Sequence, residues 1–256
     1  MSENLRIERQ GRVLRLVLDR PEKRNALNLA LCRELVKQVE EAWRDHGVGA
    51  ILLAGEGKSF CAGMDLTEML SPEAAGLTHI HELLFTIGVR SSKPIVAAVQ
   101  GAALAGGTGL AANAHILVAA EDATFGLTEI RLGLWPFVVF RAVALAVGER
   151  RAVELSLTGR TFDAREAAQL GLVDCLVPPA DLDARALEIA TAVAAASPSA
   201  VRGGLAYLAE SRGRSSEETG RIAYQYRAEL FRSPDFAEGL RAFHEKRAPR
   251  WPSLEE

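Results

Sequence analysis

The sequence of 256 residues is poor in cysteine and carries little excess charge of either sign. Its three cysteines, Cys32, Cys61 and Cys175, are odd in number and far apart, which excludes a disulfide framework and a zinc pattern. Lys and Arg number 30 against 33 Asp and Glu, and this balance argues against a nucleic-acid binder, which normally carries a basic stripe. The first ten residues hold no apolar signal core. We therefore expect a cytoplasmic protein with no metal site and no nucleic-acid partner.

Charge is absent altogether from residues 94–120, which contain no Asp, Glu, Lys or Arg. Length alone makes this stretch a candidate membrane span. Its interior holds four glycines together with Gln100, Asn113 and His115, so a buried core segment with a glycine-rich turn is the better interpretation. The composition, 48% hydrophobic and 25% charged, is ordinary for a globular enzyme. No membrane partner is expected.

Short apolar runs that alternate with helical periodicity predict a parallel α/β core. Asn28 is placed to cap a helix that continues to Trp43. The runs that read as strands are 13–18, 50–54, 94–99 and 115–119. Beyond Pro179 the sequence predicts only helices, at 182–196, 199–210, 217–231 and 235–246. We expect an α/β core over residues 1–195 and an all-helical region over 196–256.

The glycine cluster admits three interpretations. Gly107-x-Gly109-x-x-Ala112, with Glu129 twenty residues after Gly109, matches the dinucleotide fingerprint of an NAD-dependent oxidoreductase, although residues 100–104 separate it from the preceding strand. Small residues also simply permit close helix packing. Thirdly, a glycine-rich turn that opens a helix exposes free N–H groups, and residues 60–65 offer a second such turn. Two N–H groups from two turns can form an oxyanion hole around a carbonyl oxygen.

Six segments, taken in order, resemble the enoyl-CoA hydratase/isomerase (crotonase) superfamily. They are 20–27 (RPEKRNAL), 57–65 (GKSFCAGMD), 99–107 (VQGAALAGG), 125–129 (FGLTE), 167–174 (AAQLGLVD) and 243–247 (FHEKR). The resemblance implies a crotonase-like spiral core of repeated ββα units followed by a helical trimerisation region. It also implies an acyl-CoA thioester substrate, no separate cofactor because coenzyme A is part of that substrate, and a homotrimer or a hexamer built from two trimers.

By the family's pattern, the backbone N–H groups of Met64 and Gly106 hold the thioester oxygen, and Glu129 acts as acid/base. The family's hydratases carry a second glutamate three residues after Gly106, where this chain has Gly109. One carboxylate suffices to take a proton from one carbon and return it two carbons away, as in the family's Δ3,Δ2-enoyl-CoA isomerases. We therefore favour double-bond isomerisation over hydration.

Two other interpretations of the family resemblance stay open. One is an enoyl-CoA hydratase in which another group holds the water; the candidates are His81, Glu68 and Glu82. The other is an acyl-CoA-binding homologue that has lost catalysis.

The resemblance also points to residues that contact coenzyme A, namely Arg24, Ala26, Lys58, Ala62, Asp65, Leu66 and Lys246. The alternatives that involve no ligand are solvated surface charges for the cations and a helix cap for Asp65. Bulky residues after Glu129 predict a dry acyl pocket, with Leu134, Trp135, Phe137 and Phe140 as its lining and a raised pKa for Glu129. The competing role for Glu129 is an ion pair with Arg131 or Arg141.

Overall fold

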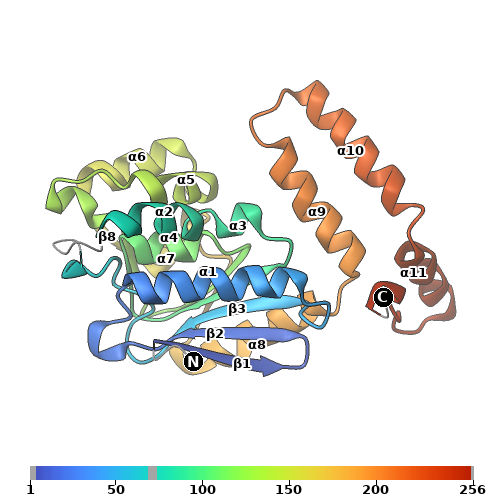
Figure 1. Cartoon of the computed structure of the whole chain (residues 1–256), viewed down its shortest axis with the longest axis horizontal. Coiled ribbons are helices and arrows are strands. Elements are labelled where there is room, and N and C mark those ends of the chain that lie inside the picture. Colours follow the sequence, from blue (N-terminus) through green and yellow to red (C-terminus); the bar gives the residue numbers. More distant parts are fainter. Residues whose placement is uncertain (1–3, 69–73, 255–256) are drawn as a thin grey trace.

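The computed structural model describes residues 4–68 and 74–254 (Figure 1). Its larger sheet has six strands in the order β1-β2-β3-β4-β6-β9, and a smaller sheet has the order β5-β7-β8. All neighbours in the larger sheet are parallel except β1 and β2, as expected for an α/β core. The strands are β1 Leu5–Gln10, β2 Val13–Leu18, β3 Ala50–Gly55, β4 Ile95–Val99, β5 Ala102–Leu104, β6 Ile116–Ala120, β7 Thr124–Gly126, β8 Thr161–Asp163 and β9 Cys175–Val177.

The helix predicted from Asn28 to Trp43 and the four helices predicted beyond Pro179 are all present, and further helices lie between them. Asn28 caps the first of them, because its side chain accepts a hydrogen bond from the Leu31 N–H. They are α1 Leu29–Arg44, α2 Ala74–Leu84, α3 Ile87–Arg90, α4 Gly106–Ala112, α5 Phe137–Val147, α6 Glu149–Thr158, α7 Ala164–Gln169, α8 Leu182–Ala194, α9 Pro198–Ser211, α10 Ser216–Leu230 and α11 Pro234–Glu245. Short 3₁₀ turns include Thr128–Leu132 and Pro252–Leu254.

The larger sheet buries both of its faces, which explains why its central strands are almost continuously apolar. Along β2, Leu16 and Leu18 join the core shared with α1, whereas Val13 and Val17 face the opposite side. On that opposite side the small residues of α8, such as Ala186, pack against the sheet. Helix α8 therefore completes the core, and α9 begins the region beyond it.

Five strands, β1, β5, β7, β8 and β9, were not predicted from the sequence. Strand β1 is an exposed antiparallel edge with charged residues, so it lacks the apolar run that marks a buried strand. The other four are three residues long and carry almost no periodicity of their own.

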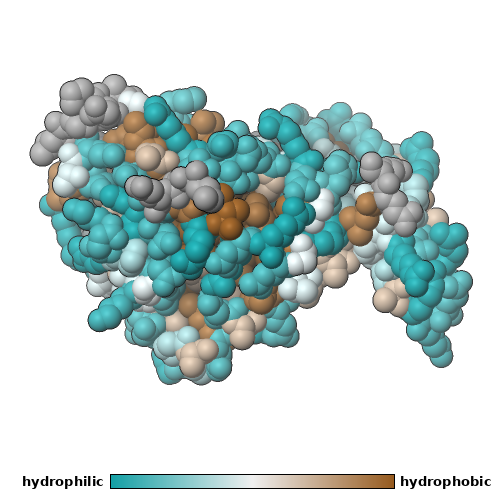
Figure 2. Space-filling model, turned by 60° about the horizontal axis from the view of Figure 1, so that its bottom comes forward, coloured by the Kyte–Doolittle hydropathy of each residue, from teal (hydrophilic) through white to brown (hydrophobic). Residues whose placement is uncertain are grey.

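The helical region leaves the core as a hairpin of α9 and α10, and α11 lies at the end of the molecule away from the sheets (Figure 1). The face turned forward in Figure 2 is mostly hydrophilic, with apolar side chains gathered in separate patches. The uncharged stretch 94–120 divides into β4, β5, α4 and β6. Among the described residues, no helix combines the length and apolar character needed to cross a bilayer.

Candidate active site

Two turns that the sequence places far apart meet at Met64 and Gly106. A β-carbon built on Gly63 would lie 3.4 Å from the Gly106 nitrogen. Leu27 bonds to the residues on either side of Met64, donating its N–H to the Gly63 carbonyl at 2.8 Å and accepting from the Asp65 N–H at 3.0 Å. Neither the Met64 N–H nor the Gly106 N–H donates a hydrogen bond within the described residues. The structure thus brings together two unused backbone donors.

The turn before Gly106 is strained and firmly held. Ala105 has φ 51° and ψ −118°, a conformation that costs a non-glycine residue about 1–3 kcal/mol. Its N–H donates to the Gly126 carbonyl at 2.7 Å, and the buried Thr108 hydroxyl accepts from the Gly126 N–H at 3.0 Å. Gly106 is the first residue of α4, so its N–H points out of the helix end. Strain is retained here because surrounding bonds fix the turn.

Glu129 lies three residues after Gly126, the last residue of strand β7, in the 3₁₀ turn Thr128–Leu132. Its side chain is 7% exposed, and Oε2 has no hydrogen-bond partner in the described chain. Burial raises the pKa of this carboxyl above its ordinary value. The alternative of an ion pair with Arg131 or Arg141 is wrong, since among the described residues Glu129 contacts no cation.

The family's hydratases carry their second acid at the position of Gly109. In this chain the space beside Gly109 is filled by a side chain from another helix. A β-carbon built on Gly109 would lie 2.4 Å from Val139 Cγ1 and 2.5 Å from Val139 Cβ. Contacts this short do not occur between real side chains, so Val139 of α5 occupies the space that any side chain at 109 would need.

The dinucleotide interpretation of this segment is wrong. Gly107 and Gly109 lie inside α4, where both are buried, rather than in a phosphate-binding turn. A β-carbon on Gly107 would lie 2.0 Å from the Cys61 carbonyl oxygen. These glycines therefore serve close packing.

The three candidates for a water-holding group differ sharply. Glu68 accepts a hydrogen bond from the Leu29 N–H at 2.7 Å, and Glu82 is exposed. His81 is buried on α2, with its ring tilted against Phe85 at 5.8 Å and Nε2 without a partner among the described residues. Burial lowers its pKa, which favours the neutral imidazole. Phe85 in turn lies against Gly106, with Cζ 3.1 Å from a β-carbon built there.

The predicted coenzyme A residues of the core lie on two adjoining segments. The Ala62 N–H donates to the Arg24 carbonyl at 3.0 Å, which joins residues 24–26 to residues 62–66. Arg24, Lys58 and Leu66 are exposed, and Ala26 and Ala62 are half-buried. Lys246 follows α11, which lies at the other end of the molecule from α2 and α4 (Figure 1).

Asp65 is bound within the protein. Its carboxylate accepts from the Thr67 hydroxyl at 2.6 Å and from the Thr67 N–H, and it pairs with Arg20 at 3.1 Å. The Thr67 hydroxyl bond, which outweighs burial, and the Arg20 bond lower its pKa. This agrees with a capping role at the turn rather than direct contact with a ligand.

The residues predicted to line an acyl pocket fall into two groups. Trp135 and Phe140 are half-buried, with their rings 5.8 Å apart. Leu134 and Phe137 are exposed in the single chain, Phe137 to 74%. A pocket formed by all four residues stays a prediction.

Asn25 is a fully buried residue that was not predicted from the sequence, and it ties the turn after Arg20 to residues 56–59. The backbone φ of Asn25 is 55°. Its side chain accepts a hydrogen bond from the Arg20 N–H and donates hydrogen bonds to the carbonyls of Glu56 and Ser59. Asparagine tolerates the left-handed region better than most residues, but the sequence carried no other signal of this role. A cluster of three His, Cys, Asp or Glu side chains that could hold a metal ion is not present among the described residues.

Similar solved structures define the fold class of this chain, and similar sequences define its family. The fold is that of the crotonases. The enoyl-CoA hydratase of Mycobacterium smegmatis superposes with a TM-score of 0.91 at 32% identity, covering 97% of this chain and 98% of that one. An enoyl-CoA hydratase/isomerase from Marinobacter aquaeolei also gives 0.91, at 30% identity, with 97% and 99% covered.

The family model for enoyl-CoA hydratase/isomerase matches residues 8–254. The mevalonyl-coenzyme A hydratase of Aspergillus fumigatus is 39% identical over 248 residues, covering 93% of this chain and 91% of the relative. An enoyl-CoA hydratase of Mycobacterium tuberculosis is 36% identical over 255 residues, with 96% and 95% covered. The chain belongs to the enoyl-CoA hydratase/isomerase family, whose members act on acyl-CoA thioesters.

Proposed function

We propose that this protein is an enoyl-CoA isomerase that uses Glu129 as its only acid/base. The backbone N–H groups of Met64 and Gly106 are the proposed oxyanion hole for the thioester oxygen. The observation that carries the proposal is the contact at Gly109: Val139 fills the place of a second carboxylate, which leaves Glu129 as a buried acid whose Oε2 has no hydrogen-bond partner among the described residues.

In the proposed reaction the Glu129 carboxylate removes a proton from C2 of a 3-enoyl-CoA. The electrons of the C–H bond form the enolate, whose negative oxygen receives the two N–H donors; each such donor is worth about 3–4 kcal/mol. The protonated Glu129 then returns the proton to C4, and the double bond moves from C3–C4 to C2–C3. A raised pKa suits this role, because it makes the carboxylate a stronger base and brings its pKa nearer to neutral pH, so that the group can both take up and return the proton.

A side-by-side assay of 3-enoyl-CoA isomerisation and 2-enoyl-CoA hydration tests the proposal. We expect isomerisation to dominate, and Glu129→Gln to reduce it by about 10²–10⁴-fold. An exposed-residue control, Glu82→Gln, should leave the rate unchanged. Full isomerase activity in Glu129→Gln would show that another group moves the proton.

Hydration is the second candidate, and His81 is the observation that favours it. Its unpartnered Nε2 is the buried polar atom best able to hold a water molecule among the three groups considered. The relatives compared are also named hydratases. Hydration far faster than isomerisation, lost in His81→Leu, would decide for this function. Tight acyl-CoA binding with no turnover of either substrate would indicate a homologue without catalysis.

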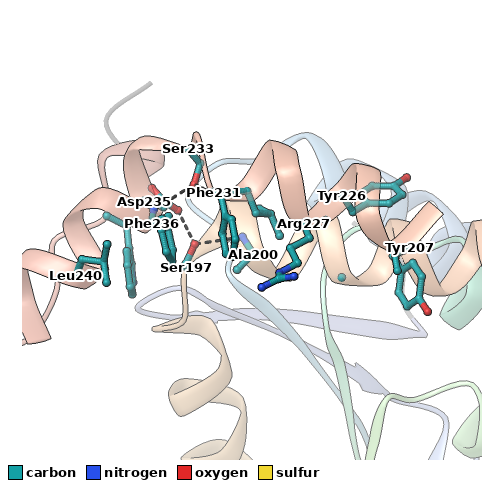
Figure 3. Close-up of a pocket in the computed structure, with 16 residues that line it drawn as sticks. Ser197, Ala200, Tyr207, Tyr226, Arg227, Phe231, Ser233, Asp235, Phe236 and Leu240 are labelled. Carbon is teal, nitrogen blue, oxygen red and sulfur yellow. Dashed lines mark hydrogen bonds between the residues drawn. The ribbon is translucent and has the colours of Figure 1, made fainter. Parts of the chain in front are cut away.

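We also propose that copies of this chain associate as a trimer or a hexamer through the helical region. A groove of about 700 Å³ lies between α9, α10 and α11 and is mainly apolar (Figure 3). Phe231 and Phe236 stack at its edge with ring centres 4.9 Å apart, and Arg227 lies over Phe231 at 4.8 Å. Since α11 lies far from α2 and α4 in one chain, Lys246 would reach coenzyme A only in another copy.

A further inference from the structure

A second, separate pocket lies where the core meets the helical region. Its volume is about 130 Å³. The residues that line it come from the three segments that precede β2, β3 and β4, from the α8–α9 junction and from the turn Pro252–Leu254. Four cations line it, together with His46: Arg12, Arg44, Lys93 and Arg202. It contains no carboxylate among its lining residues, and none of these cations forms an ion pair within the described residues.

The neighbouring acids are already engaged. Asp45 lies beside the pocket, but its carboxylate pairs with Arg9 at 2.8 Å and accepts the Gly47 N–H. Asp235 reaches the pocket edge only through Ser253, whose hydroxyl it binds at 2.8 Å. Asp45 attracts Lys93 at longer range, but among the described residues neither carboxylate forms an ion pair with a cation of the pocket.

The inner cations are held in place by backbone carbonyls, which are neutral groups. Arg12 donates to the Ala194 carbonyl at 2.7 Å, and the buried Arg12 Nε has no partner. Lys93 donates to the carbonyls of Asp45 and Val48, which leaves one ammonium hydrogen free. Burial first, and then the charge of Arg12, lowers the pKa of Lys93. Clustered positive charge of this kind is costly unless an anion balances it.

We propose that this pocket binds a small multivalent oxyanion of the phosphate class. The volume exceeds the ~10–15 Å³ that one water requires but is well below the ~300 Å³ of a pocket for a larger metabolite. Guanidinium groups match the oxygens of a tetrahedral phosphate, and lysine adds a point charge. Because Arg12 and Lys93 belong to the core and Arg202 to α9, the bound anion links the core to the helical region.

The test is thermal unfolding and calorimetric titration of the full chain with inorganic phosphate, compared with sodium chloride at equal ionic strength. Phosphate should raise the melting temperature. The exposed pocket variants Arg44→Gln and Arg202→Gln should lose most of the rise and weaken binding at least tenfold. Glycerol 3-phosphate, run in parallel, distinguishes a free phosphate ion from a phosphate end of a larger molecule.

Lys58→Gln is the matched control, since it removes an exposed cation from the proposed coenzyme A site and should keep the phosphate effect. Three results would overturn the proposal: no phosphate-specific rise in any protein, a rise that persists in both pocket variants, or a rise lost in Lys58→Gln alone.

Discussion

At the scale of single residues, burial changes the acid–base behaviour of Glu129. A carboxyl with a raised pKa binds a proton in the folded chain at pH values where the unfolded chain has already released it. The free energy of unfolding therefore falls as the pH rises from the unfolded pKa through the folded one. At neutral pH, the burial of Glu129 therefore lowers the free energy of unfolding, while it provides the site with a buried base.

Glu129→Gln should consequently be more stable than the parent protein at pH 7–8, since the amide has no charge to bury. The difference should shrink as the pH falls from the folded pKa of Glu129 towards the ordinary glutamate value of about 4, below which residue 129 is neutral in both proteins. Melting temperatures of the two proteins between pH 4 and 8 check this. A difference that does not change with pH would mean that Glu129 is not desolvated in solution.

Asp235 is the opposite case. Burial alone would raise its pKa, but hydrogen bonds from Ser197, Ser253 and Ser199 outweigh burial and hold the value at about 2. A lowered folded pKa stabilises the protein above the ordinary value, and that contribution is lost as the pH falls towards 2. Figure 3 shows Asp235 and Ser197 facing each other between α11 and the start of α9.

Asp235→Asn should therefore lower the free energy of unfolding by about 2 kcal/mol at pH 7, and by progressively less as the pH falls from about 4 to 2. Urea unfolding at several pH values measures it. Ser233→Ala, which removes the cap of α11 but no contact to Asp235, is the control and should cost about 1 kcal/mol at every pH.

At the scale of elements, the packing of α4 against α5 decides how many carboxylates the site can hold. Gly109→Glu alone should destabilise the protein by ~3 kcal/mol or more, because the new side chain overlaps Val139. Val139→Gly alone should also cost ~3 kcal/mol, through a cavity and a glycine in a helix. In the double variant the two costs should partly cancel, by at least about 1 kcal/mol, since each change relieves the other.

The same double variant should gain 2-enoyl-CoA hydration relative to the parent, because a second carboxylate could enter the site. Unfolding free energies and hydration rates for both single variants and the double variant form the cycle. Gly109→Glu combined with Val143→Gly is the matched control: Val143 lies one turn along α5 and is equally buried, but the three atoms nearest a β-carbon built on Gly109 all belong to Val139. If the losses in unfolding free energy of Gly109→Glu and Val139→Gly simply add in the double variant, the proposed contact between residues 109 and 139 is contradicted.

Elements also show what the sequence could predict. Long periodic segments such as α1, and buried runs such as β3 and β4, were predicted because burial on one face or both leaves a repeating pattern. The pairing of the two turns at Gly63 and Gly106 was expected from the glycine-rich pattern, whereas the roles of Met64, Gly106 and Glu129 were expected from the family resemblance and stay predictions. Neither Val139 at Gly109 nor the positive φ of Ala105 could be predicted, because each arises from packing between distant segments.

At the scale of the whole molecule, a single chain exposes large apolar side chains at two separate places. Phe137 and Leu132 near Glu129, and Phe231 and Leu240 beside the groove of the helical region, are each about half exposed or more. Patches of this kind mark association surfaces. Both ends of the chain would be covered at once if the helical region of one copy contacted the core of the next.

Leu240→Glu should therefore dissociate the assembly, because a carboxylate in an apolar interface has no partner. Sedimentation or light scattering should show a trimer or hexamer for the parent protein and a monomer for the variant. Enoyl-CoA turnover should fall as well, since Lys246 could then no longer reach another copy. Ile7→Glu, on the exposed edge strand β1, is the control and should leave both mass and turnover unchanged. A parent protein that is monomeric and fully active would contradict the proposed assembly.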